Sequence, residues 1–101
     1  MKYQITFRER ASREYLDALL WYKIRSINAA ERFVKAIDEA LESVAANPER
    51  SRNTYKNFYE IGVKRFPFRV VYFIDGAERK IVVVSIFHLR RSPKNKFDEN
   101  K

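Results

Sequence analysis

Several residue types that common active sites require are scarce or absent in this sequence. Its 101 residues include no cysteine, two glycines and one histidine. Without cysteine there is neither a disulfide framework nor a thiolate zinc site, and a single histidine argues against a dedicated transition-metal centre. Gly62 and Gly76 alone cannot build a glycine-rich loop that cradles phosphate groups. We therefore expect no metal site and no cofactor.

Long apolar stretches are also missing. No run approaches the roughly 20 apolar residues that a membrane-spanning helix needs, and the first residues lack the apolar core of a signal peptide. With 46% hydrophobic and 15% aromatic residues, the chain can nevertheless bury a core. We expect one soluble, cytoplasmic domain over residues 1–97, followed by a disordered tail at residues 98–101.

Positive charge is concentrated in the second half of the chain, and the net charge is +8. Residues 1–48 contain 8 Lys or Arg against 7 Asp or Glu, whereas residues 49–101 contain 13 against 6. A small soluble domain often carries a net charge of about 2–8, so solubility is one explanation. The asymmetry favours the other one, which is an anionic partner such as nucleic acid or an acidic protein segment.

An alternating segment and then a helical segment open the chain. Apolar residues at every second position, Tyr3, Ile5 and Phe7, predict a half-buried strand. The spacing then becomes helical, and Ser12 is the expected N-cap of the first helix. The apolar stripe of this helix comprises Leu16, Leu19, Leu20, Trp21, Tyr22, Ile24 and Ile27. Such a stripe predicts a face that packs on another layer.

A second helix is expected from Asn28 to Asn47. Asn28 and Glu31 have the spacing of a capping box, in which each of the two residues satisfies a free backbone N–H of the other. Pro48 ends the helix because its ring disfavours helical geometry in the residue before it. Two amphipathic helices separated by a short break predict a helical hairpin.

Three strands are expected in the second half, over residues 59–63, 68–74 and 80–88, after a polar loop at residues 48–57. Residues 80–88 are apolar on both faces, which is typical of a central strand. Strands joined by short turns pair in antiparallel fashion. The predicted fold is therefore α+β with the order β-α-α-β-β-β, an antiparallel sheet with the helical hairpin packed on one face.

Six basic residues stand at or near the ends of these strands. They are Lys64, Arg65, Arg69, His88, Arg90 and Arg91. In the simplest interpretation the five Lys and Arg residues bind a target, either an acidic protein surface or a nucleic-acid backbone. Alternation places Arg69 on the sheet face away from the helices, where a structural ion pair with Glu60 is the alternative.

A metal-free endoribonuclease is the second interpretation of this cluster. Arginine can clamp a phosphate, and histidine can transfer a proton near neutral pH. The candidate catalytic residues are Arg69, His88, Arg90 and Arg91. The set contains no clear general base, for which Glu60 is one candidate, and a lone histidine at a strand end is more often a packing residue. Whether the protein is an enzyme is therefore left open.

The order of these segments resembles the RelE/ParE superfamily of bacterial type II toxins. The matching stretches are Ala30 to Leu41, Asn47-Pro48, Phe66 to Tyr72, and Ile81 to His88 followed by Arg90-Arg91-Ser92-Pro93. The resemblance implies a toxin that arrests growth and a cognate antitoxin that holds it inactive in a hetero-oligomer. It also implies one of two targets: messenger RNA in the ribosomal A site for the RelE-like branch, or DNA gyrase for the ParE-like branch.

The resemblance also implies roles for individual residues. Arg69 falls where the ribonuclease members place an arginine that contacts phosphate, and His88 falls where some of them place a catalytic histidine. Arg90 and Arg91 lie near the functional positions at the end of the family pattern.

Three departures from the ribonuclease pattern argue against RNA cleavage, and the long helical hairpin and the chain length resemble the ParE-like branch. A lysine pair of the second strand is reduced to Lys64 and Arg65, Leu89 stands where a tyrosine would follow His88, and no acidic general base is clearly matched. We therefore lean weakly towards gyrase as the target. RNA cleavage is the alternative, and a degenerate member that only binds its antitoxin is a third one.

Overall fold

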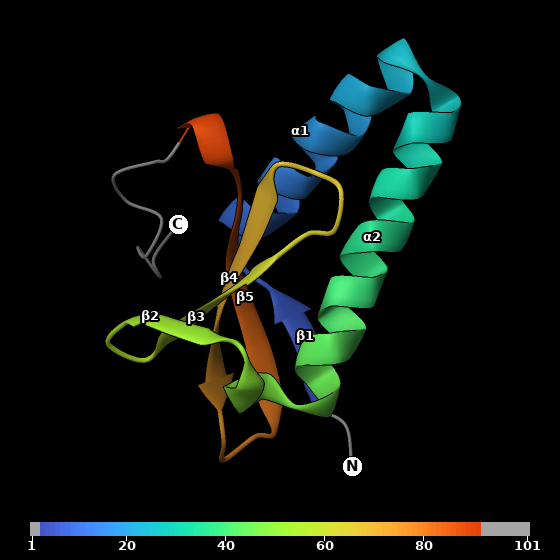
Figure 1. Cartoon of the computed structure of the whole chain (residues 1–101). Coiled ribbons are helices and arrows are strands. Elements are labelled where there is room, and N and C mark those ends of the chain that lie inside the picture. The colour runs from blue at the N-terminus through green and yellow to red at the C-terminus, as the bar shows by residue number, and fades with distance from the viewer. Residues whose placement is uncertain (1–2, 92–101) are drawn as a thin grey trace.

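The structure, a computed structural model, describes residues 3–91 without the side chain of Arg91. Helices α1 (Glu9–Arg25) and α2 (Ile27–Ala46) lie together on one face of a five-stranded sheet (Figure 1). The strands are β1 (Gln4–Phe7), β2 (Arg52–Tyr55), β3 (Phe58–Gly62), β4 (Phe68–Asp75) and β5 (Lys80–His88), with 3₁₀ turns at Pro48–Arg50 and Leu89–Arg91. The predicted α+β fold with its helical hairpin is confirmed. The predicted tail at residues 98–101 lies outside the described residues.

The sheet differs from the predicted one in two details. The strand order is β1-β5-β4-β3-β2, and β1 pairs with β5 in parallel, so the sheet is mixed rather than antiparallel. No turn joins β1 to β5, and the antiparallel rule for turn-connected strands does not govern this pair. The second detail is β2, which lies within the segment predicted as a loop. Its residues are polar because it is an exposed edge strand, paired to β3 through its backbone.

The N-caps of both helices differ from the predicted ones. Helix α1 begins at Glu9, three residues before Ser12. Ser26 ends α1 and caps α2, because its hydroxyl oxygen accepts a hydrogen bond from the Ala29 N–H at 3.1 Å. Ser26 thus fills the role predicted for Asn28, and a single residue separates the two helices. Within residues 3–91, neither helix is long and apolar enough to cross a membrane.

The apolar stripe predicted for α1 largely faces solvent. The α1 residues that meet the core are Ala11, Tyr15, Ala18, Leu19 and Tyr22. Leu16, Leu20 and Ile24, which follow one another at four-residue spacing, are 56%, 54% and 80% exposed. Two alanines let α1 lie close to the sheet, and the neighbouring aromatic rings supply the contact area. The helix was predicted correctly, but of its predicted stripe only Leu19 and Tyr22 pack against the core.

Each face of the sheet carries its own apolar cluster. Under the helices, the ring of Phe33 from α2 lies 5.1–5.9 Å from the rings of Tyr15, Tyr22, Phe66 and Phe68. The cluster on the opposite face consists of Phe58, Val71, Val82, Val84 and Phe87. Phe68, Val70 and Tyr72 of β4 belong to the cluster under the helices, as alternation predicts.

A β-bulge in β5 changes which way the end of this strand faces. Val71 of β4 pairs with Ser85, but the next residue, Tyr72, pairs with Val83, so Val84 has no partner. Val83 and Ile86 both join the cluster under the helices, although they are three positions apart. Strict alternation would have placed residue 88 on the opposite face. The bulge therefore turns His88 towards the helices.

Candidate functional site

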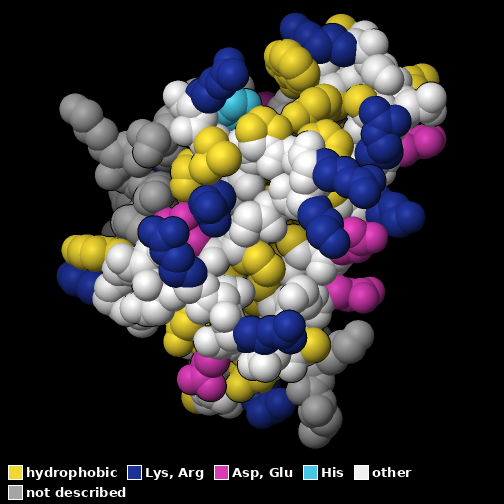
Figure 2. Space-filling view, viewed as in Figure 1, with side chains coloured by type: hydrophobic (Ala, Val, Ile, Leu, Met, Phe, Trp, Pro, Cys, Tyr) yellow, Lys and Arg dark blue, Asp and Glu magenta, His cyan; other side chains and the backbone are white. Residues whose placement is uncertain are grey.

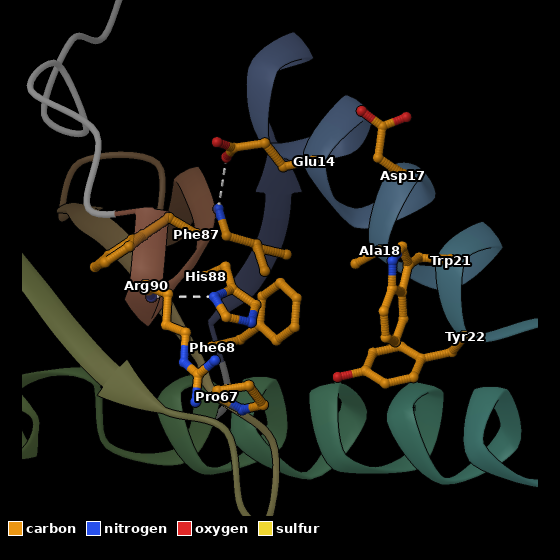
Figure 3. Close-up of a pocket in the computed structure, with 11 residues that line it drawn as sticks. Glu14, Asp17, Ala18, Trp21, Tyr22, Pro67, Phe68, Phe87, His88 and Arg90 are labelled. Atoms are coloured by element: carbon orange, nitrogen blue, oxygen red, sulfur yellow. Dashed lines mark hydrogen bonds between the residues drawn. The ribbon is translucent and has the colours of Figure 1, made fainter. Parts of the chain in front are cut away.

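A groove of about 730 Å³ opens between α1 and the place where β4 begins and β5 ends (Figure 3). It is lined by Glu14, Asp17, Ala18, Trp21, Tyr22, Pro67, Phe68, Ile86, Phe87, His88 and Arg90. We call it the His88 groove. Its α1 side presents aromatic rings and two carboxylates, and its strand side presents the histidine and an arginine. It combines the polar and apolar groups that ligand and partner sites use.

His88 is held in this groove on two sides. Its ring stands edge-on to that of Phe68, its direct partner on β4, with 5.1 Å between the ring centres. Its Nδ1 accepts a hydrogen bond from the backbone N–H of Arg90 at 3.0 Å (Figure 3). This bond requires Nδ1 without a proton, so the neutral ring carries its proton on Nε2. His88 therefore has a structural role: its ring packs on Phe68, and its Nδ1 satisfies the backbone N–H of Arg90.

Glu14 closes the edge of β5 beside the groove. Strand β1 ends opposite Val83, so within residues 3–91 the following part of β5 has no strand on that side. One carboxylate oxygen of Glu14, Oε1, accepts hydrogen bonds from the hydroxyl of Ser85 at 2.8 Å and from the N–H of Ile86 at 2.9 Å. The other oxygen, Oε2, lies 3.5 Å from Nε of Arg10. The side chain replaces a missing strand and joins α1 to the sheet.

Arg69 lies on the other face of the sheet from His88. It is paired with Phe87 on β5 and with Gly62 on β3, and its Nε is 3.9 Å from Oε1 of Glu60. Glu60 is only 7% exposed, whereas the side chain of Arg69 is 35% exposed. The structural ion pair considered from the sequence is therefore present. The sheet itself separates Arg69 from the His88 groove.

A second groove of about 640 Å³ lies between α2 and the turn that joins β3 to β4. It is lined by Tyr22, Ala29, Arg32, Lys35, Ala36, Glu39, Lys64, Arg65, Phe66 and Pro67. We call it the Arg65 groove. Two of its lining residues, Tyr22 and Pro67, also line the His88 groove, so the two grooves are neighbours. Figure 2 shows Lys and Arg side chains around hydrophobic ones on this face of the molecule.

The structure thus divides the six basic residues predicted from the sequence. Lys64, Arg65, His88 and Arg90 lie in the two neighbouring grooves. Arg69 stands apart on the opposite face, and the side chain of Arg91 lies outside the described residues. Tyr22 forms the shared wall, and burial raises the pKa of its hydroxyl above the usual value of 10.0. It is therefore a hydrogen-bond donor at neutral pH.

The fold and its grooves can now be set beside known proteins. A family model described as the ParE toxin of the type II toxin–antitoxin system, parDE, matches residues 5–93. The chain belongs to this ParE toxin family. It is a toxin of the type II toxin–antitoxin class, and the matched span includes both helices and every residue that lines the two grooves. No curated protein sequence matches the chain.

Solved structures share the fold of this ParE-family protein at low sequence identity. A chain of the chromosomal ParDE TA system from P. aeruginosa is 14% identical with a TM-score of 0.73, over 87% of this chain and 97% of that chain. A mutant of E. coli toxin RelE in the free state is 19% identical with a TM-score of 0.65, over 98% and 94%. A chain of the RelBE2 toxin–antitoxin complex from Mycobacterium tuberculosis is 15% identical with a TM-score of 0.62, over 87% of this chain and 99% of that chain.

Sequence reasoning missed several residues that shape the site of this ParE-family protein. Glu14 was not singled out, although its spacing from Ala11 and Ala18 places it on the buried face of α1. Arg32 and Lys35 of α2 were not singled out either. Only the tertiary contact with the β3–β4 turn brings them beside two more cations. The spacing of Glu14 was a usable signal, whereas nothing in the sequence linked α2 to that turn.

Proposed function

We propose that this ParE-family protein arrests growth by binding DNA gyrase rather than by cleaving RNA, and that a cognate antitoxin neutralises it. The observation that carries the proposal is the separation of Arg69 from His88. A metal-free nuclease needs its proton donor and its phosphate clamp on the same scissile group. A sheet stands between these two side chains, and Glu60 already pairs with Arg69.

Two further features support action by binding. Large apolar side chains of α1 are exposed and the Arg65 groove is cationic, a combination that marks protein interaction surfaces. The RelBE2 relative was solved as a toxin–antitoxin complex. By analogy we expect an antitoxin to bind this chain in a hetero-oligomer.

The test is to induce the protein and ask which cellular process stops first. With gyrase as the target, purified chain plus gyrase and supercoiled DNA accumulates cleaved DNA, and cells show the DNA-damage response before translation falls. An Arg69→Ala, His88→Ala double variant keeps this effect if both chains are equally folded. An immediate stop in translation with cut messenger RNA on purified ribosomes would overturn the proposal.

RNA cleavage remains the second candidate because of one observation. His88, Arg90, Glu14 and Asp17 line the same groove, so a group that can transfer a proton and a cation share one site there. A nuclease built on this groove would use His88 and Arg90 without Arg69. In that case His88→Ala alone abolishes cleavage, whereas Arg69→Ala leaves it intact, and the two single variants separate this candidate from the four-residue site predicted from sequence.

A further inference from the structure

The lining of the Arg65 groove contains four cations and only one acidic side chain. Arg32 and Lys35 stand one turn apart on the exposed side of α2, and Lys64 and Arg65 face them from the β3–β4 turn. Towards other residues within 3–91, none of these four cations makes an ion pair or a side-chain hydrogen bond. Glu39 is the only acidic side chain of the lining. The groove therefore presents a net charge of +3 to whatever enters it.

Small and aromatic side chains form the apolar part of the groove. Ala29 and Ala36 lie seven residues apart on α2, so they share one side of that helix, and Tyr22, Phe66 and Pro67 complete the lining. Alanine leaves room for another backbone to approach α2 closely. A phosphate backbone needs cations but gains little from this apolar floor. The combination suits a peptide with both acidic and apolar side chains.

The backbone of the β3–β4 turn holds Arg65 in an unfavourable conformation. Its φ is 70°, in the left-handed region that glycine and asparagine adopt more easily. Two backbone hydrogen bonds stabilise the turn. The N–H of Val63 donates to the carbonyl of Phe68 at 3.0 Å, and the N–H of Phe66 donates to the carbonyl of Val63 at 3.2 Å. A residue that costs stability and makes no ion pair or side-chain hydrogen bond within residues 3–91 is a candidate for a functional role.

We propose that the Arg65 groove binds an acidic, amphipathic segment of the neutralising antitoxin. The inference rests on the proposed function, because it names where and by what chemistry that partner docks. The acidic side chains of the segment face Arg32, Lys35, Lys64 and Arg65, and its apolar side chains rest on Ala29, Ala36 and Phe66. Apolar contact fixes the position of the segment, and the four cations select against neutral or basic partners.

A matched pair of variants tests the proposal in the full chain. Arg65→Gly and Lys56→Gly each remove one exposed cation from a left-handed position of a strand-connecting turn, since Lys56 has a φ of 49°. Only Arg65 lines the groove. Both variants should keep or raise the melting temperature because glycine relieves the strain. A loss of binding in Arg65→Gly therefore cannot be attributed to unfolding.

The probe is a synthetic 16-residue helical peptide with Glu and Leu on adjoining faces, followed by fluorescence anisotropy. We expect Arg65→Gly to bind it roughly three- to tenfold more weakly than the wild type, as loss of one partly desolvated charge contact implies, and Lys56→Gly to bind within about twofold. An Arg32→Ala, Arg65→Gly double variant should lose more. The same peptide with Gln in place of Glu should bind weakly to all of these chains.

Three results would overturn the proposal: equal weakening by Arg65→Gly and Lys56→Gly, equal binding of the Glu and Gln peptides, or Arg65-dependent binding of a DNA or RNA oligonucleotide tighter than that of the peptide. The last result would assign the groove to nucleic acid. Growth arrest gives an independent readout. A chain that binds the peptide as expected but does not arrest growth would refute the proposed function and leave the groove assignment standing.

Discussion

Helices α1 and α2 attach to the same sheet in opposite ways. Helix α2 buries large apolar side chains, among them Phe33, Ile37 and Val44, and exposes charged ones. Helix α1 buries two alanines, rests on aromatic rings and a glutamate, and exposes Leu20 and Ile24 among other apolar residues. The first pattern is that of a structural helix. The second leaves apolar area in water, which is costly unless a partner covers it.

This difference assigns separate tasks to the two helices. Helix α2 supplies the stability that fixes the sheet and its turns. Helix α1 rests on the sheet through small residues, aromatic rings and the hydrogen bonds of Glu14, and it leaves large apolar side chains exposed on its outer side. The assignment predicts that substitutions in α2 act mainly on folding, whereas those on the outer side of α1 act mainly on recognition.

The largest effect is expected for Phe33→Ala in α2. Phe33 is fully buried and contacts four aromatic rings, which come from α1, the β3–β4 turn and β4. Removing the ring leaves a large cavity and should lower the free energy of unfolding by about 3–5 kcal/mol. Urea denaturation followed by circular dichroism measures the change. A loss below about 1 kcal/mol would contradict the structural role of α2.

Glu14→Ala should have the next largest effect, because it removes the polar contact that fastens α1 to β5. The hydroxyl of Ser85 and the N–H of Ile86 would lose their acceptor, which costs about 1–3 kcal/mol of unfolding free energy. Glu14→Gln keeps an acceptor oxygen and should lose less than Glu14→Ala. If both variants are as stable as the wild type, the carboxylate does not join the two elements.

The contrast between the helices also explains what the sequence could predict. In α2 the apolar residues Phe33, Ile37 and Val44 recur at helical spacing and are all buried, so the helix, its buried face and the fold class followed from periodicity. In α1 the apolar stripe suggests burial of Leu16, Leu20 and Ile24, but alanines and aromatic rings occupy the interface instead. Periodicity assumes that apolar residues are buried, and that assumption fails where a helix keeps an apolar surface exposed.

Other errors came from contacts distant in the sequence. Alternation placed Arg69 correctly, but it could not foresee that Val84 would bulge and turn His88 to the other face. The parallel pairing of β1 with β5 depends on the path of the whole chain. The cationic groove needed α2 and the β3–β4 turn to meet, which no local pattern records.

A smaller loss of stability is expected at alkaline pH. It reports on α1, because this helix contributes the aromatic rings of Tyr15 and Tyr22 to the core. Burial raises the pKa of Tyr15 and Tyr22 on α1 above 10.0, and Asp38 raises that of Tyr15 further. The unfolded chain therefore ionises these phenols first, so their contribution is fully present below about pH 10 and is lost as the pH rises through the folded values.

The measurement is the free energy of unfolding in urea as a function of pH. We expect it to fall above about pH 10 in the wild type. Tyr22→Phe should reduce that fall, since phenylalanine cannot ionise, and the residual slope should reflect Tyr15 and the buried Tyr72. If Tyr22→Phe leaves the pH dependence of the free energy of unfolding unchanged, ionisation of the Tyr22 phenol does not affect stability.

The smallest effect on stability, and the sharpest test of the comparison, is expected for Leu20→Ser. Leu20 is 54% exposed, so the free energy of unfolding of the free chain should change by no more than about 0.5 kcal/mol. Co-expression with the antitoxin should nevertheless fail to restore growth, because a partner that covers the outer side of α1 would lose apolar contact area.

Ile37→Ser is the matched control on the buried side of α2, and it should unfold the chain and abolish toxicity altogether. If Leu20→Ser is both stable and fully neutralised by the antitoxin, the outer surface of α1 is not the antitoxin contact. Its exposed apolar residues would then belong to the binding site for the toxin's target.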